Sequence, residues 1–277
     1  MKFIRAFAFV VLWSISVSGE DQVATIIQRS VEANNRDWNA APQFDYYERD
    51  QRPDGSKTFA VTMLYGSRYE RLIALNGNPL GAEKEAEEQK KFEKAVSERR
   101  SEPPEKRAAR IAKYEAERKR DHNMLDQITA AFDFKLLGEQ KLRGRRVYVL
   151  RATPRKGYQP PNRDSQVLTG MEGRLWVDHD TFQWVKVEAH VTRPVRIQGF
   201  LAEVEPGTQF ELEKMPVSAD IWLATHFTMK SNAKVILFFR HRSQEDNTFF
   251  NYHKGAGASQ EAQATSPSSK NGDNGPK

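Results

Sequence analysis

Residues 173–191 constrain the fold of this chain most, because they read as the two strands of a β-hairpin. In the first arm Leu175 and Val177 occupy alternate positions between Arg174 and Asp178, and in the second arm Val185 and Val187 also alternate. The polar cluster Asp178-His179-Asp180-Thr181 separates the arms. Alternation with a period of two is typical of an antiparallel sheet that has one dry face. The hairpin therefore predicts a sheet with one side toward a core.

The two dry faces of this hairpin must coincide, and a slip of one residue would turn every side chain to the other face. The register that meets this condition pairs Leu175 with Val185 and Trp176 with Trp184. It predicts a connection with an odd number of residues, three or five.

The rest of the chain contributes further strands with similar alternation. They are expected at residues 44–52, 58–65, 68–75, 134–141, 146–154, 196–204, 209–214, 219–229, 233–240 and 248–252. The last three are expected to be separated by turns at Ser231-Asn232 and at Gln244-Glu245-Asp246-Asn247. About ten or eleven strands that are mostly sequence neighbours predict a single antiparallel sheet, too large to stay flat. The predicted fold class is α+β, an open half-barrel with helices on its concave side.

Two helical regions accompany the strands. Apolar residues at helical spacing from Val23 to Val31 predict an N-terminal amphipathic helix that ends near Asn34-Asn35. Residues 83–131 are rich in Glu, Lys, Arg and Ala and are broken by Pro103-Pro104, which predicts two helices. This insertion is either a solvated helical hairpin held by charge pairs or a movable lid over an apolar opening. The apolar residues expected on its inner side are Ile111, Leu125, Ile128 and Phe132.

The ends of the chain indicate export. Residues 1–19 combine a short basic start, an apolar run and small residues, as a cleaved signal peptide does; retention as an anchor is the alternative. The mature domain is expected at residues 20–254, and residues 255–277 read as a disordered tail. The chain has no cysteine, so it forms no disulfide and lacks the residue to which bacterial lipoproteins attach their lipid. These features predict a soluble protein of a bacterial periplasm.

The formal net charge is +6. Because an exported chain rarely meets nucleic acid, we expect no nucleic-acid partner. The charge serves either peripheral contact with anionic lipid head groups or solubility alone.

No motif for catalysis, metal binding or a cofactor stands out. Asp178-His179-Asp180 reads as a polar turn, since three adjacent residues of an extended chain do not converge on one ion. His122 and Asp126 share a helix face without a second histidine, which indicates a solvated pair. Acid–base pairs such as Glu70 with Glu188, or Asp220 with His226, are not brought together by any motif. We expect no catalytic centre, no metal and no cofactor.

The inner rows of a curved sheet either fill its interior or line a cavity for an apolar guest. The residues expected there are Phe59, Val61, Met63, Leu175, Val177, Val185, Val187, Ile221, Leu223 and Phe227. Periodicity alone favours the first of these two arrangements, an ordinary packed core.

The order of these segments resembles a known family. An export signal, a first helix, a three-strand meander, a helical insertion and a run of hairpins are similar to the periplasmic lipoprotein carriers of LolA/LolB type. The strand–turn–strand at residues 173–188, with its Asp-containing turn and Lys186-Val187-Glu188 run, resembles that family's recurrent pattern. The resemblance implies an open half-barrel with a helical lid around a cavity for acyl chains. The long charged insertion and the tail depart from the family, and the missing cysteine excludes its membrane-anchored member.

The resemblance implies a soluble periplasmic carrier of a lipid or an acylated cargo such as a lipoprotein, moving it toward the outer membrane. Transient envelope protein partners fit this function. The alternative is an envelope scaffold or interaction protein with a solid core and no ligand. A hydrolase is a third possibility for which the sequence names no catalytic residue.

Overall fold

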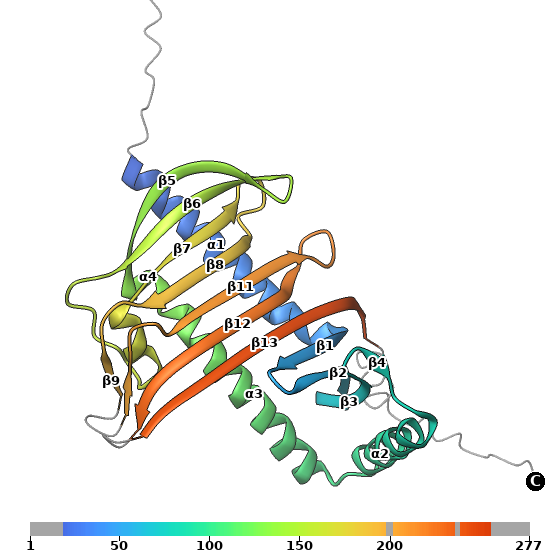
Figure 1. The fold of residues 1–277 in the computed structure, drawn as a ribbon. Helices are drawn as coiled ribbons and strands as arrows, with labels where there is room; N and C mark the ends of the chain where they lie inside the picture. Colours follow the sequence, from blue (N-terminus) through green and yellow to red (C-terminus); the bar gives the residue numbers. More distant parts are fainter. Residues whose placement is uncertain (1–18, 198–201, 236–238, 256–277) are drawn as a thin grey trace, which may run out of the picture.

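The computed structural model describes residues 19–197, 202–235 and 239–255. Within them the strands form one antiparallel sheet, in the order β4-β3-β2-β1-β13-β12-β11-β8-β7-β6-β5, with β9 and β10 attached beside β12. Because β4 and β5 do not pair, the sheet stays open. This arrangement confirms the predicted α+β half-barrel (Figure 1).

The strands are β1 Phe44–Arg52, β2 Gly55–Leu64, β3 Ser67–Leu75, β4 Asn78–Pro79, β5 Phe132–Leu142, β6 Arg145–Pro154, β7 Met171–Asp178, β8 Trp184–Val191, β9 Val195–Ile197, β10 Ala202–Val204, β11 Gln209–Pro216, β12 Trp222–Val235 and β13 Phe239–Lys254. The helices are α1 Gly19–Ala40, η1 Ala41–Gln43, α2 Ala82–Arg100, α3 Pro104–Asp126, α4 Ile128–Ala131 and η2 Asp164–Gly170. None of the described helices has the length and apolar character that crossing a bilayer needs.

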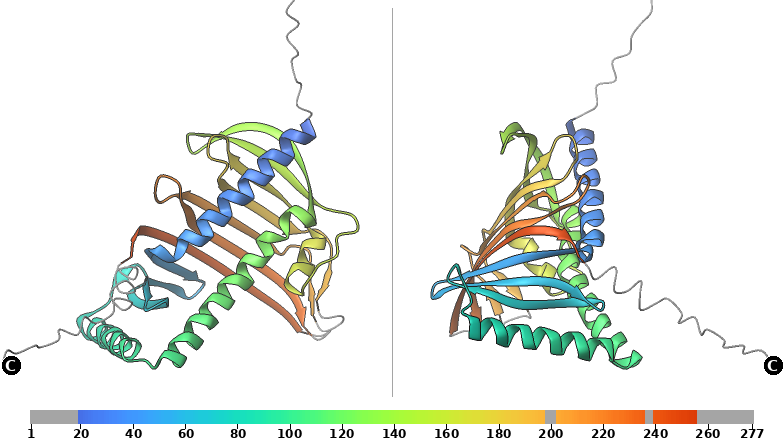
Figure 2. Two further views of the ribbon diagram at one scale, coloured as in Figure 1. Left: turned by 180° about the vertical axis from the view of Figure 1, so that it is seen from behind. Right: turned by 90° about the vertical axis from the view of Figure 1, so that its right-hand side faces the viewer.

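Helices α1 and α3 cover the same face of the sheet. Figure 2 shows both crossing the concave side diagonally, while α2 lies against the β3 end of the sheet. The core beneath α1 joins Ile26 and Ile27 to strand residues such as Leu150 and Val177. Two helices on one face of a large sheet leave part of that face for shorter segments to cover.

Tight turns explain why the first strands lie where the sequence predicts them. Tyr65-Gly66, Asn76-Gly77 and Arg143-Gly144 each place two successive residues at positive φ. Such two-residue turns have the twist that antiparallel hairpins require, and glycine adopts positive φ without strain. The predicted meander at residues 44–75 is confirmed to within three residues at each strand end.

The predicted register of the central hairpin is wrong. Trp176 pairs with Lys186 and Val177 pairs with Trp184, so Val185 is an extra residue in a β-bulge. Leu175 consequently pairs with Val187 instead of Val185. The bulge turns Val185 toward the face of Trp176, where both pack against Trp222 in a separate cluster. The connection, residues 179–183, does have five residues.

The C-terminal strands also differ from the prediction. No turn occurs at residues 231–232 or 244–247, because both stretches lie inside the long strands β12 and β13. Their polar residues belong to paired strand positions, for example Lys230 with Gln244. The single strand predicted at residues 196–204 is instead the antiparallel pair β9 and β10. Residues 1–18 of the predicted signal peptide and residues 256–277 of the predicted tail lie outside the described residues, while Gly19 begins α1.

Helix α1 is longer than predicted because its last turns bury polar side chains. Asp37 is 2% exposed and accepts hydrogen bonds from Lys214 Nζ on β11 at 2.5 Å, from Gln183 Nε2 at 3.1 Å and from the Trp222 backbone N–H at 3.0 Å. Lys214 Nζ also donates to Asn34 Oδ1 at 2.8 Å. Burial lowers the pKa of Lys214, and the charge of Asp37 opposes that shift. This polar cluster fixes the end of α1 to three separate parts of the sheet.

Removing one member of the buried pair should destabilise the protein strongly. Replacing Asp37 by Ala leaves Lys214 buried without its counter-charge, and we expect a loss of about 3–5 kcal/mol in the free energy of unfolding. The exposed pair Asp133–Arg155 provides the matched control, since Asp133→Ala should cost about 1 kcal/mol or less. Urea unfolding measures both values, and equal losses would contradict a special role for Asp37.

Candidate functional site

The concave face contains an apolar cavity of about 340 Å³. Its floor comes from β7, β8, β11 and β12, its side from β5 and β6, and its remaining wall from α4 and η2. The wall exposes almost only carbon. The side chains that line it include Ile128, Phe132, Phe134, Ala152, Val167, Leu168, Met171, Leu175, Trp184, Val187, Ala189, Phe210, Leu212, Phe227 and Met229.

Strand alternation accounts for this apolar wall. Glu188 lies between Val187 and Ala189 in β8, and Glu211 lies between Phe210 and Leu212 in β11. Because successive strand residues point to opposite faces, both carboxylates belong to the outer side, where Lys186 Nζ contacts them at 2.8 Å and 3.0 Å. Charged strand residues next to the cavity therefore reach it only through their backbone.

Short segments close the end of the cavity. Helix α4 places Ile128 at the wall, and η2 adds Val167 and Leu168. The loop before η2 is tied to α4, because Arg155 N–H donates to Ala131 O at 2.8 Å and Tyr158 Oη donates to Gln127 Oε1 at 3.1 Å. A cluster of Phe132, Leu168, Met171, Val191 and Val195 packs around these segments.

Five of the fourteen residues predicted for the interior and the lid line this cavity. Leu175, Val187, Phe227, Ile128 and Phe132 line the cavity. Two further residues of the predicted set belong to the same strands, β7 and β8, but do not line the cavity. Val177 is buried beneath α1, and Val185 is turned to the opposite side by the bulge.

The other predicted interior residues lie elsewhere. Phe59, Val61 and Met63 belong to β2, on the far half of the sheet. Ile221 precedes β12, Leu223 is buried within it, and Ile111 is half-buried on α3. The side chain of Leu125 lies outside the described part.

Sequence reasoning missed the contribution of residues 155–169, because this stretch shows no periodicity and offers no interior residue by alternation. Val167 and Leu168 are adjacent in the chain and reach the wall through the short helix η2. It also missed Phe210, Leu212 and Met229, although alternation in β11 and β12 places them beside Val187 and Phe227. That alternation is a signal that could have identified them.

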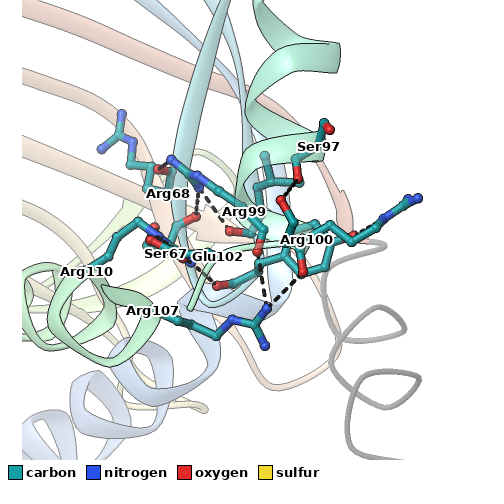
Figure 3. Close-up of polar contacts among 11 residues, drawn as sticks. Ser67, Arg68, Ser97, Arg99, Arg100, Glu102, Arg107 and Arg110 are labelled. Atoms are coloured by element: carbon teal, nitrogen blue, oxygen red, sulfur yellow. Dashed lines mark hydrogen bonds and ion pairs between the residues drawn. The ribbon is translucent and has the colours of Figure 1, made fainter. Parts of the chain in front are cut away.

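The elbow between α2 and α3 is clamped to the turn between β2 and β3 (Figure 3). Arg99 donates to Leu64 O at 2.9 Å and to Ser67 O at 3.0 Å. Arg110 donates to Ser67 Oγ at 2.6 Å and to Tyr65 O at 3.1 Å.

Two more contacts brace the elbow itself. Arg110 forms an ion pair with Glu102 at 2.7 Å, and this hydrogen bond holds the pKa of Glu102 below its usual range. Arg107 donates to the last carbonyls of α2, those of Arg99 and Arg100, at 3.2 Å each. The elbow end of the predicted lid is therefore fixed to the sheet.

The other end of α3 is held against α1 by aromatic contacts. The ring of His122 stacks on Trp38 with 4.4 Å between ring centroids, and Arg118 lies over the same indole at 4.3 Å. Arg118 also donates to Trp38 O at 2.6 Å. His122 Nε2 lies 3.0 Å from Asn35 Oδ1, while Nδ1 is buried without a partner. Burial lowers the pKa of His122; Asp126 opposes this shift and Arg118 adds to it.

The polar residues considered for chemistry have other roles. Asp178 accepts hydrogen bonds from the Thr181 N–H and hydroxyl at 2.9 Å and 2.8 Å, so it organises the predicted polar turn. His226 contacts Asp246 at 2.9 Å rather than Asp220. Among the described residues, no group of three His, Asp or Glu side chains is placed to hold a metal ion.

Loss of Arg110 should loosen the elbow locally. Replacing Arg110 by Ala leaves Tyr65 O and the Ser67 hydroxyl without their donor, at a cost of about 1–3 kcal/mol in the free energy of local opening. Hydrogen exchange of the amides in residues 64–70 and 99–110 measures this cost. Arg100→Ala is the control, because the Arg100 side chain is exposed and bonds the Tyr65 hydroxyl at the surface, so exchange close to that of the parent protein is expected. Equal exchange in both variants would contradict the clamp.

The contact of His122 with α1 should weaken in acid. Because the folded-state pKa lies below the unfolded value of about 6.5, the unfolded chain binds the proton first and stability falls as the pH drops below that value. The decrease ends once the pH is below the folded-state pKa. His122→Gln keeps a donor for Asn35 and does not titrate, so its melting temperature should fall less between pH 7.5 and 5. Parallel melting curves for the two proteins would refute this role.

Comparisons with known proteins give structural neighbours only. No protein-family model and no curated protein matches the chain. Similar solved structures include a DUF1329 family protein from Desulfovibrio piger, with 12% identity, coverage of 85% of this chain and 94% of that one, and a TM-score of 0.31. A LolA superfamily protein from Nitrosomonas europaea has 12% identity, coverage of 83% and 91%, and a TM-score of 0.31. A domain described as an outer membrane lipoprotein-sorting protein from Vibrio parahaemolyticus has 10% identity, coverage of 82% and 92%, and a TM-score of 0.30.

Proposed function

We propose that this protein is a carrier of the bacterial envelope that holds the acyl chain of a lipid or an acylated molecule in the concave cavity. The observation that supports it best is the wall of that cavity, which presents apolar side chains from both the sheet and the covering helices. An apolar wall offers a charged or strongly polar guest nothing to replace its hydration. A hydrocarbon chain gains instead, by about 0.8 kcal/mol for each methylene group that leaves water.

The size of the cavity fits a modest guest. Ligand sites typically occupy about 300–1,000 Å³, and about 340 Å³ lies at the lower end of that range. We therefore propose one acyl chain, or part of one, rather than several. Selectivity for the hydrocarbon part should be weak, because burial of methylene groups does not depend on direction.

The alternative of an interaction protein with a solid core is less favoured. A solid core would leave no open volume between the sheet and the segments α4 and η2. Here Leu212 and Phe227 on the floor and Ile128 and Val167 on the opposite wall border one open volume. A carrier uses that volume, whereas a scaffold does not need it. The periplasmic location and the direction of transport, toward the outer membrane, are part of the same proposal.

Filling the cavity should abolish binding of a hydrocarbon probe. Ala189 lines the cavity from β8, so Ala189→Phe places a phenyl ring inside it. We expect at least about a tenfold loss in affinity for a fluorescent fatty acid, which corresponds to about 1.4 kcal/mol. Fluorescence titration of the purified protein measures this affinity.

The matched control is Ala60→Phe, the same substitution at a half-buried strand position that does not line the cavity. It should bind the probe as the parent protein does. The carrier proposal is wrong if the parent protein does not bind the probe, or if both variants bind it equally well.

A further inference from the structure

An acylated guest has a polar end, and the cavity provides no site for it. The polar strand residues nearest the wall, such as Glu188 and Glu211, point to the outer face of the sheet. A charged group inside the cavity would lose its hydration without gaining a partner. The polar end of the guest therefore has to lie outside the cavity while its chain stays inside.

A second hollow lies directly behind η2. This groove, which we call the η2 groove, measures about 500 Å³ and is lined by Gln166, Thr169, Arg193, Pro194, Val195, Arg196 and Glu203. Gln166 and Thr169 are three residues apart and share one side of the 3₁₀-helix η2. Val167 and Leu168 of the same helix line the acyl cavity. The helix η2 thus has the cavity on one side and the η2 groove on the other.

The wall between the two spaces is thin. Val195 lines the η2 groove and is 6% exposed, and it packs in one cluster with Leu168 and Met171, which line the cavity. Gly170 makes this close packing possible, because a Cβ atom at that position would lie 2.4 Å from Val195 Cγ2. A guest whose chain fills the cavity therefore has its polar end within reach of the groove once it passes the edge of η2.

The η2 groove carries positive charge. Arg193 donates one hydrogen bond, to Thr169 O, and makes no ion pair with any carboxylate in the described ranges. Arg196 contacts Glu203 at 3.5 Å, and its side chain stays 78% exposed. Two guanidinium groups and one carboxylate leave a net charge of about +1, with several N–H donors of both arginines directed to solvent.

The hollow on the outer face of the sheet has the opposite character. It is lined by four carboxylates, those of Glu188, Glu211, Glu245 and Asp246, with Lys230 as its only lysine or arginine among the described residues. It is also separated from the cavity by the sheet itself, since its carboxylates Glu188 and Glu211 alternate along their strands with the cavity residues Val187, Ala189 and Phe210. Of these two hollows, the η2 groove is the one that suits an anion.

We propose, resting on the carrier function above, that the cargo is an anionic amphiphile whose phosphoryl head group binds Arg193 and Arg196 in the η2 groove. Guanidinium groups bind phosphoryl oxygens through paired N–H donors, and this geometry favours phosphate over a neutral hydroxyl. Head-group binding would supply the selectivity that the apolar cavity lacks.

Displacement of a bound apolar dye, N-phenyl-1-naphthylamine, tests this assignment. The two competitors are dodecyl phosphate and dodecanol, which have the same hydrocarbon chain and differ in the head group. Both are used below the concentrations at which they aggregate. The parent protein should prefer dodecyl phosphate about fivefold to tenfold at low salt, and the preference should shrink as salt screens the charges. The double variant Arg193→Gln/Arg196→Gln should bind both competitors equally while keeping its affinity for dodecanol. Lys90→Gln/Lys94→Gln, which removes two exposed charges from α2, should keep the preference of the parent protein.

The outcomes separate the two proposals. Displacement by dodecanol without any advantage for the phosphate overturns the head-group site and leaves the carrier function standing. A preference that survives in the Arg193/Arg196 variant also overturns it. If glycerol 3-phosphate binds as tightly as dodecyl phosphate, the groove holds a free phosphate compound and the amphiphile assignment is wrong. Failure of the dye and of both competitors to bind refutes the carrier function itself.

Discussion

The buried contact between Asp37 and Lys214 determines how the rest of the molecule is covered. Asp37 belongs to α1, Lys214 to β11, and the other two donors to Asp37 come from the connection before β8 and from the start of β12. Desolvating two opposite charges is costly, and only good geometry with further hydrogen bonds offsets that cost. All of these donors reach the Asp37 carboxylate at the same time only when α1 lies in one position on the sheet. The C-terminal half of α1 is therefore fixed over the β11–β12 region, and its apolar residues Ile26 and Ile27 cover β6 and β7.

The cavity follows from what α1 and α3 leave uncovered. A sheet with eleven strands along one path is wider than two helices, and its open edges cannot close into a barrel that side chains fill. Short segments cover the remaining concave surface, and α4 has only four residues and η2 only seven. Pieces of this size bring few side chains inward. An apolar volume remains between them and the floor formed by Leu212 and Phe227.

Sequence patterns predicted the architecture where local chemistry decides it. The meander of β1, β2 and β3 lies where alternation predicted it, and the glycine turns Tyr65-Gly66 and Asn76-Gly77 explain why its strands end there. The prediction failed where tertiary pairing overrides local composition: residues 244–247 are polar and resemble a turn, yet they lie inside β13, paired with β12. The bulge at Val185 has no composition signal, so the register of the central hairpin and the side to which Val185 points could not be read from alternation. Leu175, Val187 and Phe227 do line the cavity, because the parts of their strands that border it alternate regularly beyond the bulges.

The contacts of the helical insertion limit how a guest could enter. One end of α3 is held by Arg99 and Arg110 at the turn between β2 and β3, and its other half is held by Arg118 and His122 on Trp38. A swing of the whole insertion would break both sets of contacts at once. Moving α4 and η2 leaves both of those sets in place, although it breaks the hydrogen bonds of Tyr158 with Gln127 and of Arg193 with Thr169 O and separates the cluster around Leu168. On the carrier proposal, the part that opens is therefore η2, the short helix that separates the acyl cavity from the arginines of the η2 groove. The acyl chain and the head group of the guest would then reach their sites through the same opening.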